Sequence, residues 1–251
     1  MKTINKNNTE YLAEAVRDFK KAYNPVALTG AGISVGSGIA DFRSPGGLWT
    51  LFSPDEYATL DVFLHNPVKA WVLYRKLGKE ISGKEPNRGH HALARLEKNN
   101  LLSTIITQNV DGLHQKAGSR DVLEIHGNHH HLHCLKCGYT TPVVEDHYTM
   151  AGVPECKLCL SPLKPDIVLF GEPVKNLDKI QDLISTCDLL LVIGTSANVF
   201  PAAGIPEAVR QRNGIIYEFN HEQVLSQADY FLKGDLEVTL PLFGDAVFTA
   251  S

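Results

Sequence analysis

Residues 107–127 of this 251-residue chain read TQNVDGLHQKAGSRDVLEIHG. The apolar run LLSTIIT (101–107) ends in Gln108, Asn109 and Asp111, and the run DVLEI (121–125) ends in His126. Strands that end in an amide, a carboxylate and an imidazole place these groups at one edge of a sheet. Ligands bind at the carboxyl edge of open α/β sheets, so the stretch predicts a site there. The alternative is that the polar residues only form turns.

Six apolar runs predict buried strands, because each is nearly continuous rather than alternating and each ends in glycine or polar residues. Helical patterns lie between several of them, over 10–23 and 90–98 among others. This alternation predicts an α/β fold with a doubly wound parallel sheet. The runs are PVALTG (25–30), LLSTIITQN (101–109), DVLEIHG (121–127), PDIVLFGE (165–172), DLLLVIGTS (188–196) and GIIYEFN (214–220).

Two stretches interrupt the alternation of strands and helices. Residues 42–88 are rich in aromatic side chains and become helical in their later part, which predicts an inserted helical module. Residues 128–164 contain two Cys-x-x-Cys pairs. We expect both stretches to form a smaller part that is inserted into the parallel-sheet domain.

Composition limits the class of protein. Hydrophobic residues make up 43% and charged residues 21%, as in ordinary globular enzymes. No apolar run approaches the roughly 20 residues of a membrane span, and the polar opening MKTINKNNTE suggests no secretory signal, so we expect a cytoplasmic protein without membrane contact. A net charge of −4 and a pI near 6.2 argue against direct nucleic-acid binding. The sequence gives no prediction of oligomeric state.

A glycine-rich loop, GAGISVGSGIADFR (30–43), follows the first predicted strand. Gly30, Ala31 and Gly32 would permit a tight turn and close approach of backbone N–H groups to a phosphate. The strict G-x-G-x-x-G pattern fails because Val35 occupies its third glycine position, so an ordinary glycine-rich turn is an open alternative. Asp41, Phe42 and Arg43 then place an acid, an aromatic ring and a cation together, which suits an enclosed polar ring or, alternatively, a loop salt bridge.

Four cysteines follow the spacing C-x2-C-x18-C-x2-C, which predicts one structural Zn²⁺ in a zinc ribbon. Such a site is closed by four thiolates and leaves no position for a catalytic water. The histidines at 129–131 and 133 lack a ligand spacing, and we interpret them as surface residues. A zinc-ribbon module that binds nucleic acid or protein is a rival interpretation, which the acidic pI disfavours. The ligands are Cys134, Cys137, Cys156 and Cys159.

With these motifs in order, the chain resembles the sirtuins, NAD-dependent protein-lysine deacylases, from about residue 24 to about residue 244. The motifs are GAGIS…SGIADFR, TQNVDGLH, IHG, the cysteine pairs, IVLFGE, GTS and EFN. The resemblance implies a Rossmann-like domain (1–41, 89–127 and 165–251) with an inserted small domain, made of a helical module (42–88) and a zinc-ribbon module (128–164).

The resemblance also assigns residues to NAD and to the substrate. An acyl-lysine protein or peptide would bind as an added strand. The cofactor-binding set is Gly30, Ala31, Gly32, Asp41, Phe42, Arg43, Gln108, Asn109, Val110, Asp111, Gly194, Thr195, Ser196 and Asn220. The substrate-contacting set is Ala58, Tyr74, Leu77, Val168, Phe170, Gly171, Glu172 and Val199.

The implied reaction transfers the acyl group of a substrate lysine to the ADP-ribose of NAD. The acyl oxygen attacks the anomeric carbon of the ribose as nicotinamide leaves, with Asn109 in the catalytic set. His126 acts as general base on a ribose hydroxyl, and the products are nicotinamide, O-acyl-ADP-ribose and free lysine. An ADP-ribosyltransferase or an NAD glycohydrolase that uses the same pocket is the alternative.

The helical module resembles that of sirtuins that remove acidic acyl groups. Ala58 and Tyr74 match that branch, but Leu77 stands where its arginine binds the distal carboxylate. On a helix the neighbouring Arg75 and Lys76 should point about 100–200° away from Leu77. A buried carboxylate without a cation is costly, so we expect deacetylation, an acceptance of longer apolar acyl groups, and weak desuccinylation.

Overall fold

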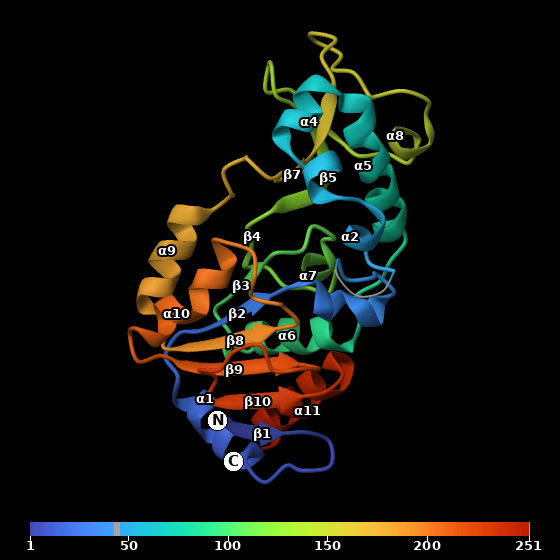
Figure 1. The fold of residues 1–251 in the computed structure, drawn as a ribbon. Coiled ribbons are helices and arrows are strands. Elements are labelled where there is room, and N and C mark those ends of the chain that lie inside the picture. Colours follow the sequence, from blue (N-terminus) through green and yellow to red (C-terminus); the bar gives the residue numbers. More distant parts are fainter. Residues whose placement is uncertain (43–45, 251) are drawn as a thin grey trace.

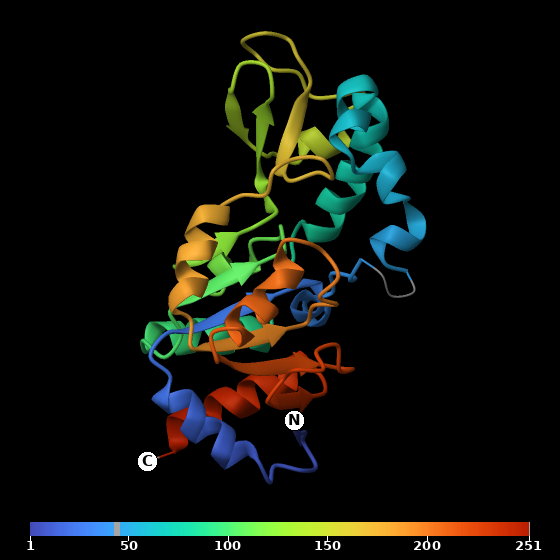
Figure 2. The ribbon, with the colours of Figure 1, turned by 60° about the vertical axis from the view of Figure 1, so that its left-hand side comes forward.

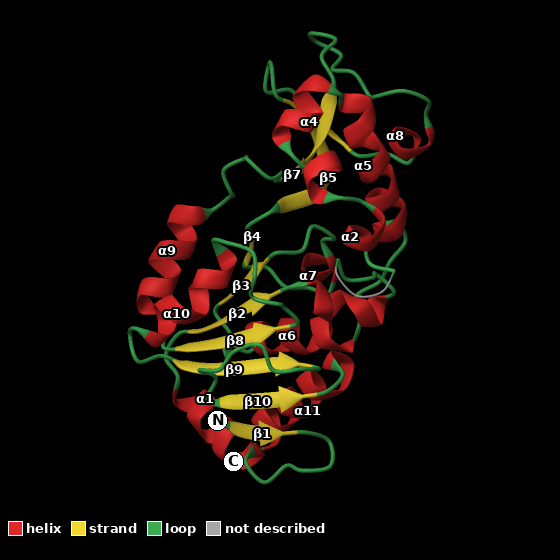
Figure 3. Ribbon diagram, viewed as in Figure 1, coloured by secondary structure: helices red, strands yellow, loops and turns green. Residues whose placement is uncertain are grey.

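The computed structural model describes residues 1–42 and 46–250. A seven-stranded parallel sheet forms the larger part, with the strand order β1-β10-β9-β8-β2-β3-β4 (Figures 1 and 3). The chain builds outward from β2 in one direction and from β8 in the other, so the topological switch point lies between these two strands. The strands are β1 (Lys2–Ile4), β2 (Pro25–Thr29), β3 (Thr104–Thr107), β4 (Val122–Glu124), β8 (Leu189–Ile193), β9 (Ile215–Asn220) and β10 (Tyr230–Lys233).

Helices cover both faces of this sheet, as the near-continuous apolar strands require. One apolar cluster joins the sheet to α1 (Leu12–Lys21), α6 (Arg88–Lys98) and α11 (Leu236–Thr249). A second cluster joins the opposite face to α9 (Leu177–Thr186) and α10 (Ile205–Arg210). The predicted doubly wound α/β fold is therefore confirmed. Short elements near the strand ends are η1 (Ala31–Ser37), α7 (Leu113–Lys116) and η2 (Ala202–Gly204).

The smaller part contains a three-stranded antiparallel sheet with its own helices, which Figure 2 shows at one end of the molecule. Its apolar cluster centres on Trp71, which is buried and donates a hydrogen bond from its indole nitrogen to the Leu163 carbonyl (2.9 Å). The elements are α2 (Leu48–Leu51), α3 (Pro54–Tyr57), α4 (Leu60–His65), α5 (Pro67–Ile81), α8 (Asp146–Thr149), β5 (Gly127–Cys134), β6 (Thr140–Pro142) and β7 (Leu163–Ile167).

Local sequence explains where the main helices of the two parts begin. Asn66 caps α5 by accepting a hydrogen bond from the Lys69 N–H, and Pro67 occupies the first turn, where it needs no donor. Asn87 caps α6, and His90 returns the interaction by accepting from the Asn87 N–H (3.3 Å). Both helices therefore start at polar residues that satisfy otherwise unpaired N–H groups.

The prediction for 165–172 was wrong about its sheet. The strand in this region is β7, and it pairs antiparallel with β5 in the small sheet rather than with the parallel strands. An apolar run alone cannot tell these two environments apart. The sequence reasoning also missed β1 and β10, which complete one edge of the large sheet. The domain boundaries inferred from the resemblance stay a prediction. Within residues 1–42 and 46–250, no helix combines the length and hydrophobicity that crossing a bilayer requires.

Candidate active site

A cleft of about 970 Å³ lies at the carboxyl ends of the parallel strands and reaches the small sheet. The loops that follow β2, β3, β8 and β9 all contribute to its lining, and the cleft is within the size range of small-molecule sites. Residues expected to act on NAD that line it are Gly30, Ala31, Gly32, Asp41, Phe42, Gln108, Asn109, Val110, His126, Gly194, Thr195, Ser196 and Asn220. Residues expected to contact the substrate that line it are Ala58, Leu77, Val168, Phe170, Gly171, Glu172 and Val199.

The predicted cofactor residue Arg43 lies outside the described residues, and Asp111 lines a smaller cavity of about 50 Å³ instead of the cleft. Asn109 and Val110 line both cavities, which places the smaller one directly beside the cleft. The polar side chains of Asn109 and Asp111 both line the smaller cavity, so a group that enters it from the cleft can contact them.

The glycines of the 30–32 loop serve a different purpose from the one predicted. The N–H groups of Gly30 and Gly32 donate to the carbonyls of Ile193 (2.9 Å) and Gly194 (2.8 Å), so they are not free to bind a phosphate. A Cβ on Gly32 would lie 2.7 Å from the Gly194 Cα, and a Cβ on Gly30 would lie 2.8 Å from the Gly194 oxygen. Glycine is required because the loops after β2 and β8 touch, backbone against backbone, at the switch point.

A buried polar network connects the loop after β2 with the loop after β3. Asn109 donates from Nδ2 to the Gly30 carbonyl (3.1 Å) and to Ser34 Oγ (3.2 Å), and Ser34 Oγ donates to Asp111 Oδ2 (2.7 Å). Burial raises the pKa of Asp111, while hydrogen bonds from the Leu113 N–H and Ser34 oppose that rise. The sequence reasoning missed Ser34, although its position two residues after Gly32 was a usable signal.

The orientation of His126 is set by one hydrogen bond. Its Nδ1 lies 3.0 Å from the Gln108 carbonyl oxygen, which can only accept, so Nδ1 carries the proton. The other ring nitrogen, Nε2, is then a free base in a residue that lines the cleft. Burial lowers the pKa of His126, and the hydrogen bond to Gln108 partly opposes this. The imidazole is therefore neutral at pH 7.

Two further hydrogen bonds hold the opposite end of the cleft together. Gln108 Nε2 donates to Thr195 Oγ1 (2.9 Å), and Asn220 Nδ2 donates to the Thr195 carbonyl (3.1 Å). The buried Glu218 accepts from the N–H groups of Val224 (2.7 Å) and Leu225 (3.0 Å), which fixes the loop after β9. The ends of β3, β8 and β9 thus form one connected wall.

The segment expected to pair with a substrate lies across the cleft from this wall. The Val168 N–H donates to the His126 carbonyl (2.8 Å), and the Phe170 N–H donates to the Ala58 carbonyl (3.0 Å). The Leu60 N–H donates back to the Phe170 carbonyl (3.0 Å). These bonds tie the segment both to His126 and to the helical module, while the N–H and the carbonyl of Leu169 are bonded to Glu172 within the segment.

The expected acyl-binding residues on α5 separate in the structure. Leu77 and Leu73 line the cleft, whereas Tyr74 is fully buried in the small-domain core, 5.6 Å from the Trp71 ring, and its hydroxyl has no partner among the described residues. Lys76 nevertheless lines the smaller cavity together with Leu77, although neighbouring residues on a helix point about 100° apart. Lys76 Nζ is paired there with Glu80 Oε1, one turn further along α5 (2.6 Å).

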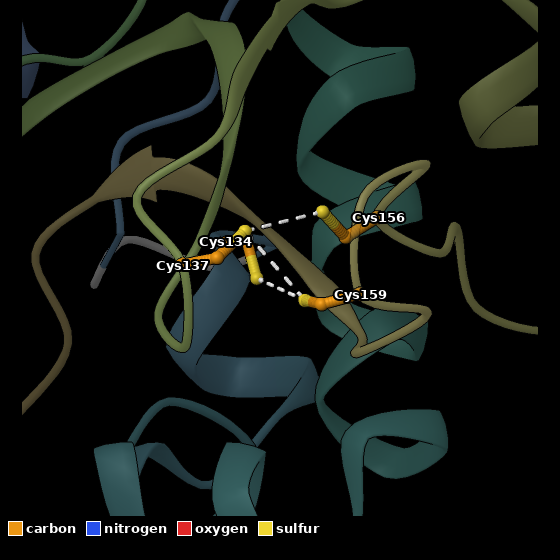
Figure 4. A group of neighbouring side chains, drawn as sticks. All are labelled: Cys134, Cys137, Cys156 and Cys159. Atoms are coloured by element: carbon orange, nitrogen blue, oxygen red, sulfur yellow. Dashed lines mark hydrogen bonds between the residues drawn. The ribbon is translucent and has the colours of Figure 1, made fainter.

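The four cysteines converge in the small part (Figure 4). Their sulfur atoms all lie within 4.8 Å of one another, none forms a disulfide, and three pairs are 3.5–3.6 Å apart. A tetrahedral Zn²⁺ with Zn–S bonds of about 2.3 Å places its sulfur ligands about 3.8 Å apart. The cluster therefore fits the predicted zinc site. It is the one group of three or more His, Cys, Asp or Glu within the described ranges that could hold a metal ion.

The interpretation of the nearby histidines was wrong for His129. Its ring is buried, its Nδ1 shares a hydrogen bond with the Tyr148 hydroxyl, and burial lowers its pKa to about 4. His130 and His131 are exposed, as expected. The pairing of β5 with β7 is irregular between Gly127 and Leu132, so the alternation of a regular strand is interrupted: His129 faces the core, the next two side chains are exposed, and Leu132 is buried again.

Comparison with known proteins places the chain in context. The model of the Sir2 family matches residues 30–201. The chain is 39% identical over 238 residues to an NAD-dependent protein deacylase of Pyrococcus abyssi, with 92% of this chain and 95% of the relative covered. It is 42% identical over 226 residues to an NAD-dependent protein deacetylase of Sulfurisphaera tokodaii, with 88% and 90% covered.

Solved structures agree with the sequence relatives. A crystal structure of a Sir2 homologue in complex with NAD superimposes with a TM-score of 0.86 at 36% identity, covering 94% of this chain and 93% of the other. A Sir2 protein with a p53 peptide and NAD superimposes with a TM-score of 0.84 at 30% identity, covering 97% and 100%.

Proposed function

The chain belongs to the Sir2 family, and from this premise we propose that it is an NAD-dependent protein-lysine deacylase. Its products would be nicotinamide, O-acyl-ADP-ribose and the free lysine. The observation that supports this most strongly is the position of His126, a neutral base at the point where the cofactor wall and the substrate segment meet.

The residues of the cleft fit NAD as the co-substrate. When bound, NAD supplies a ribose whose bond to nicotinamide breaks and which then receives the acyl group. Asn109 and Asp111, beside the smaller cavity, offer an amide and a carboxylate to the carboxamide of nicotinamide. Thr195 and Asn220 offer a hydroxyl and an amide to the adenosine side, and Gln108 lies between the two regions.

His126 is the general base in this proposal. Because Nδ1 donates to the Gln108 carbonyl, Nε2 is left to take the proton of a ribose hydroxyl. The lowered pKa keeps the base neutral somewhat below the ordinary value of 6.5, so the acidic limb of the rate profile should lie below pH 6.5. Such assistance typically contributes about 10²–10⁴ in rate.

The acyl group would be apolar. Ala58, Leu73 and Leu77 line the cleft beside the substrate segment and offer no charge to a distal carboxylate. Lys76 is already paired with Glu80. We therefore propose acetyl and longer apolar acyl groups as substrates, carried on a protein or peptide that pairs with residues 168–172, and poor removal of succinyl groups.

The cysteine cluster would hold one structural Zn²⁺ through Cys134, Cys137, Cys156 and Cys159. The metal would connect the two knuckles that precede β6 and β7 and so stabilise the small sheet. With four thiolate ligands it would have no position for a reacting water.

The test is NAD-dependent turnover of one peptide that carries acetyl, butyryl, myristoyl or succinyl lysine, followed by mass spectrometry, with His126→Ala as the inactive control. O-acyl-ADP-ribose that forms with the unaltered protein and not with the variant supports the proposal. Release of nicotinamide without acyl transfer would instead assign the chain to the NAD glycohydrolases or ADP-ribosyltransferases. Rapid desuccinylation would contradict the proposed acyl preference alone.

A further inference from the structure

Lys164 is a charged residue in the interior of the small domain. Its side chain is 1% exposed, yet it does not line the cleft and has no part in the chemistry described above. Burial of an ammonium group without partners is very unfavourable, so the surroundings of Lys164 must compensate for its charge. Burial lowers the pKa of Lys164, and the carboxylate of Glu172 opposes that change.

The partners of Lys164 lie at both ends of the segment proposed to bind the substrate. Lys164 Nζ donates to the carbonyl of Ile167 (2.5 Å), which directly precedes the segment 168–172, and lies 3.0 Å from Oε2 of Glu172, its last residue. A weaker hydrogen bond reaches the Pro165 carbonyl (3.2 Å). One ammonium group therefore connects the two ends of a turn of six residues.

The Glu172 side chain bonds to the backbone of the same turn. Its Oε2 accepts a hydrogen bond from the Leu169 N–H (2.8 Å), so the same carboxylate oxygen contacts both the ammonium and the middle of the segment. The turn also requires Gly171, whose φ of +91° is unfavourable for other residues. Without the ammonium, the carboxylate, which is only 13% exposed, would lose its charge partner and turn toward water.

We propose that Lys164 is a positioning residue for substrate binding: by joining Ile167 to Glu172 it fixes the backbone of residues 167–172 in the form that pairs with an acyl-lysine peptide. The inference rests on the proposed function, because it assumes that this segment binds the peptide. The Val168 N–H bonds to the His126 carbonyl, so the same arrangement sets the distance between the bound peptide and the base.

The test measures the affinity of an acetyl-lysine peptide and of NAD separately, by calorimetry on the zinc-loaded protein. Lys164→Met should raise the peptide Kd about tenfold, the effect of losing one charge-assisted hydrogen bond, and leave the NAD Kd within about twofold. Glu172→Gln should raise the peptide Kd in the same way. The double variant should bind the peptide with a Kd no higher than that of the weaker-binding single variant, because both substitutions remove the same interaction.

Lys69→Met is the matched control, since Lys69 is a half-exposed lysine of the same domain that pairs with Glu56 and lies over the Tyr57 ring, contacts that should contribute little. It should leave both affinities unchanged. An unchanged peptide Kd in Lys164→Met, additive effects in the double variant, or equal losses of peptide and NAD affinity would overturn the inference. If Lys164→Met does not fold, Glu172→Gln against the same control decides the question.

The two proposals fail in different ways. If the unaltered protein binds the peptide and NAD but forms no O-acyl-ADP-ribose, the proposed function is wrong and the binding comparison still tests Lys164. If it deacylates the peptide and Lys164→Met binds the peptide normally, only the positioning role is wrong. No binding of the peptide by the unaltered protein would overturn both.

Discussion

Acidification should destabilise the protein through a histidine in the core of the parallel-sheet domain. His114 is 1% exposed, and its Nε2 lies 2.9 Å from Thr29 Oγ1, which itself donates to Thr107 Oγ1. Burial lowers the pKa of His114 to about 3. Its neighbour His90, with a ring centre 5.0 Å away, has a pKa lowered to about 4 for the same reason.

The size and direction of the effect follow from these values. Above pH 6.5 the ring of His114 is neutral in both the folded and the unfolded protein, so its contribution to stability is complete. As the pH falls from 6.5 toward 3, the unfolded protein binds a proton that the folded protein does not, and stability is lost. At pH 5.0 the unfolded ring is 1.5 pH units below its pKa, which corresponds to about 2 kcal/mol. The folded pKa lies well below pH 5.0, so the result does not depend on its precise value.

The assay is urea denaturation at pH 7.5 and pH 5.0 for the unaltered protein and for His114→Gln. Glutamine retains a group that can bond to Thr29 but does not titrate, so the variant should lose about 2 kcal/mol less stability between the two pH values. His65→Gln, at an exposed histidine, should lose as much as the unaltered protein. Equal losses in the unaltered protein and in His114→Gln would refute the reasoning.

Three further predictions concern the glycine loop, the acyl group and the metal. Gly32→Ala would place a Cβ 2.7 Å from the Gly194 Cα, so it should lower the free energy of unfolding by about 1–3 kcal/mol and weaken NAD binding. Denaturation and calorimetry measure the two effects. Gly204→Ala is the control, because its Cβ would lie 3.7 Å from the nearest atom, and it should change neither quantity. Leu77→Arg should raise the ratio of succinyl to acetyl turnover about tenfold or more, and an unchanged ratio would show that this position does not contact the acyl group. Elemental analysis should find one zinc per chain, and its loss through chelation or Cys137→Ser should lower the Tm, whereas an unchanged Tm would exclude a structural metal.

The sequence predicted those parts of the structure that depend on local patterns. The buried strands, the helices α1 and α6 and the metal-ligand spacing each have a signal within a few residues, and the structure confirms the helices and all of the predicted strands of the parallel sheet except the one over 165–172. The wall of the cleft was also accessible, because polar residues at the ends of parallel strands must meet at one edge.

The remaining features depend on contacts between distant residues. Nothing in PDIVLFGE indicates that β7 pairs with β5, because the pairing joins two segments that lie about 30 residues apart in the chain. The Gly32 N–H donates to the carbonyl of Gly194, which is more than 150 residues away in the chain, so the sequence around Gly32 does not reveal its partner. Lys164 reads as an ordinary surface lysine until the structure places Glu172 beside it. Sequence reasoning fails here because burial and pairing are properties of the assembled chain.

The short motif Ile125-His126-Gly127 shows how the two parts of the molecule together define the reacting group. The chain leaves the parallel sheet at Glu124 and enters the small sheet at Gly127, so His126 lies on the link between them. Gly127 has a φ of +74°, and a Cβ there would lie 2.0 Å from the Asp166 oxygen, so only glycine permits the strands to cross this closely.

Each side of His126 is held by a different sheet. Its ring is anchored to the Gln108 carbonyl, which follows β3 of the large sheet, and its own carbonyl is held by the Val168 N–H, which follows β7 of the small sheet. The large sheet supplies the proposed cofactor wall and the small sheet supplies the proposed substrate segment. The base is therefore fixed in position only when both parts are folded and in contact, and a change that shifts one sheet relative to the other should reduce turnover even where it leaves NAD binding intact.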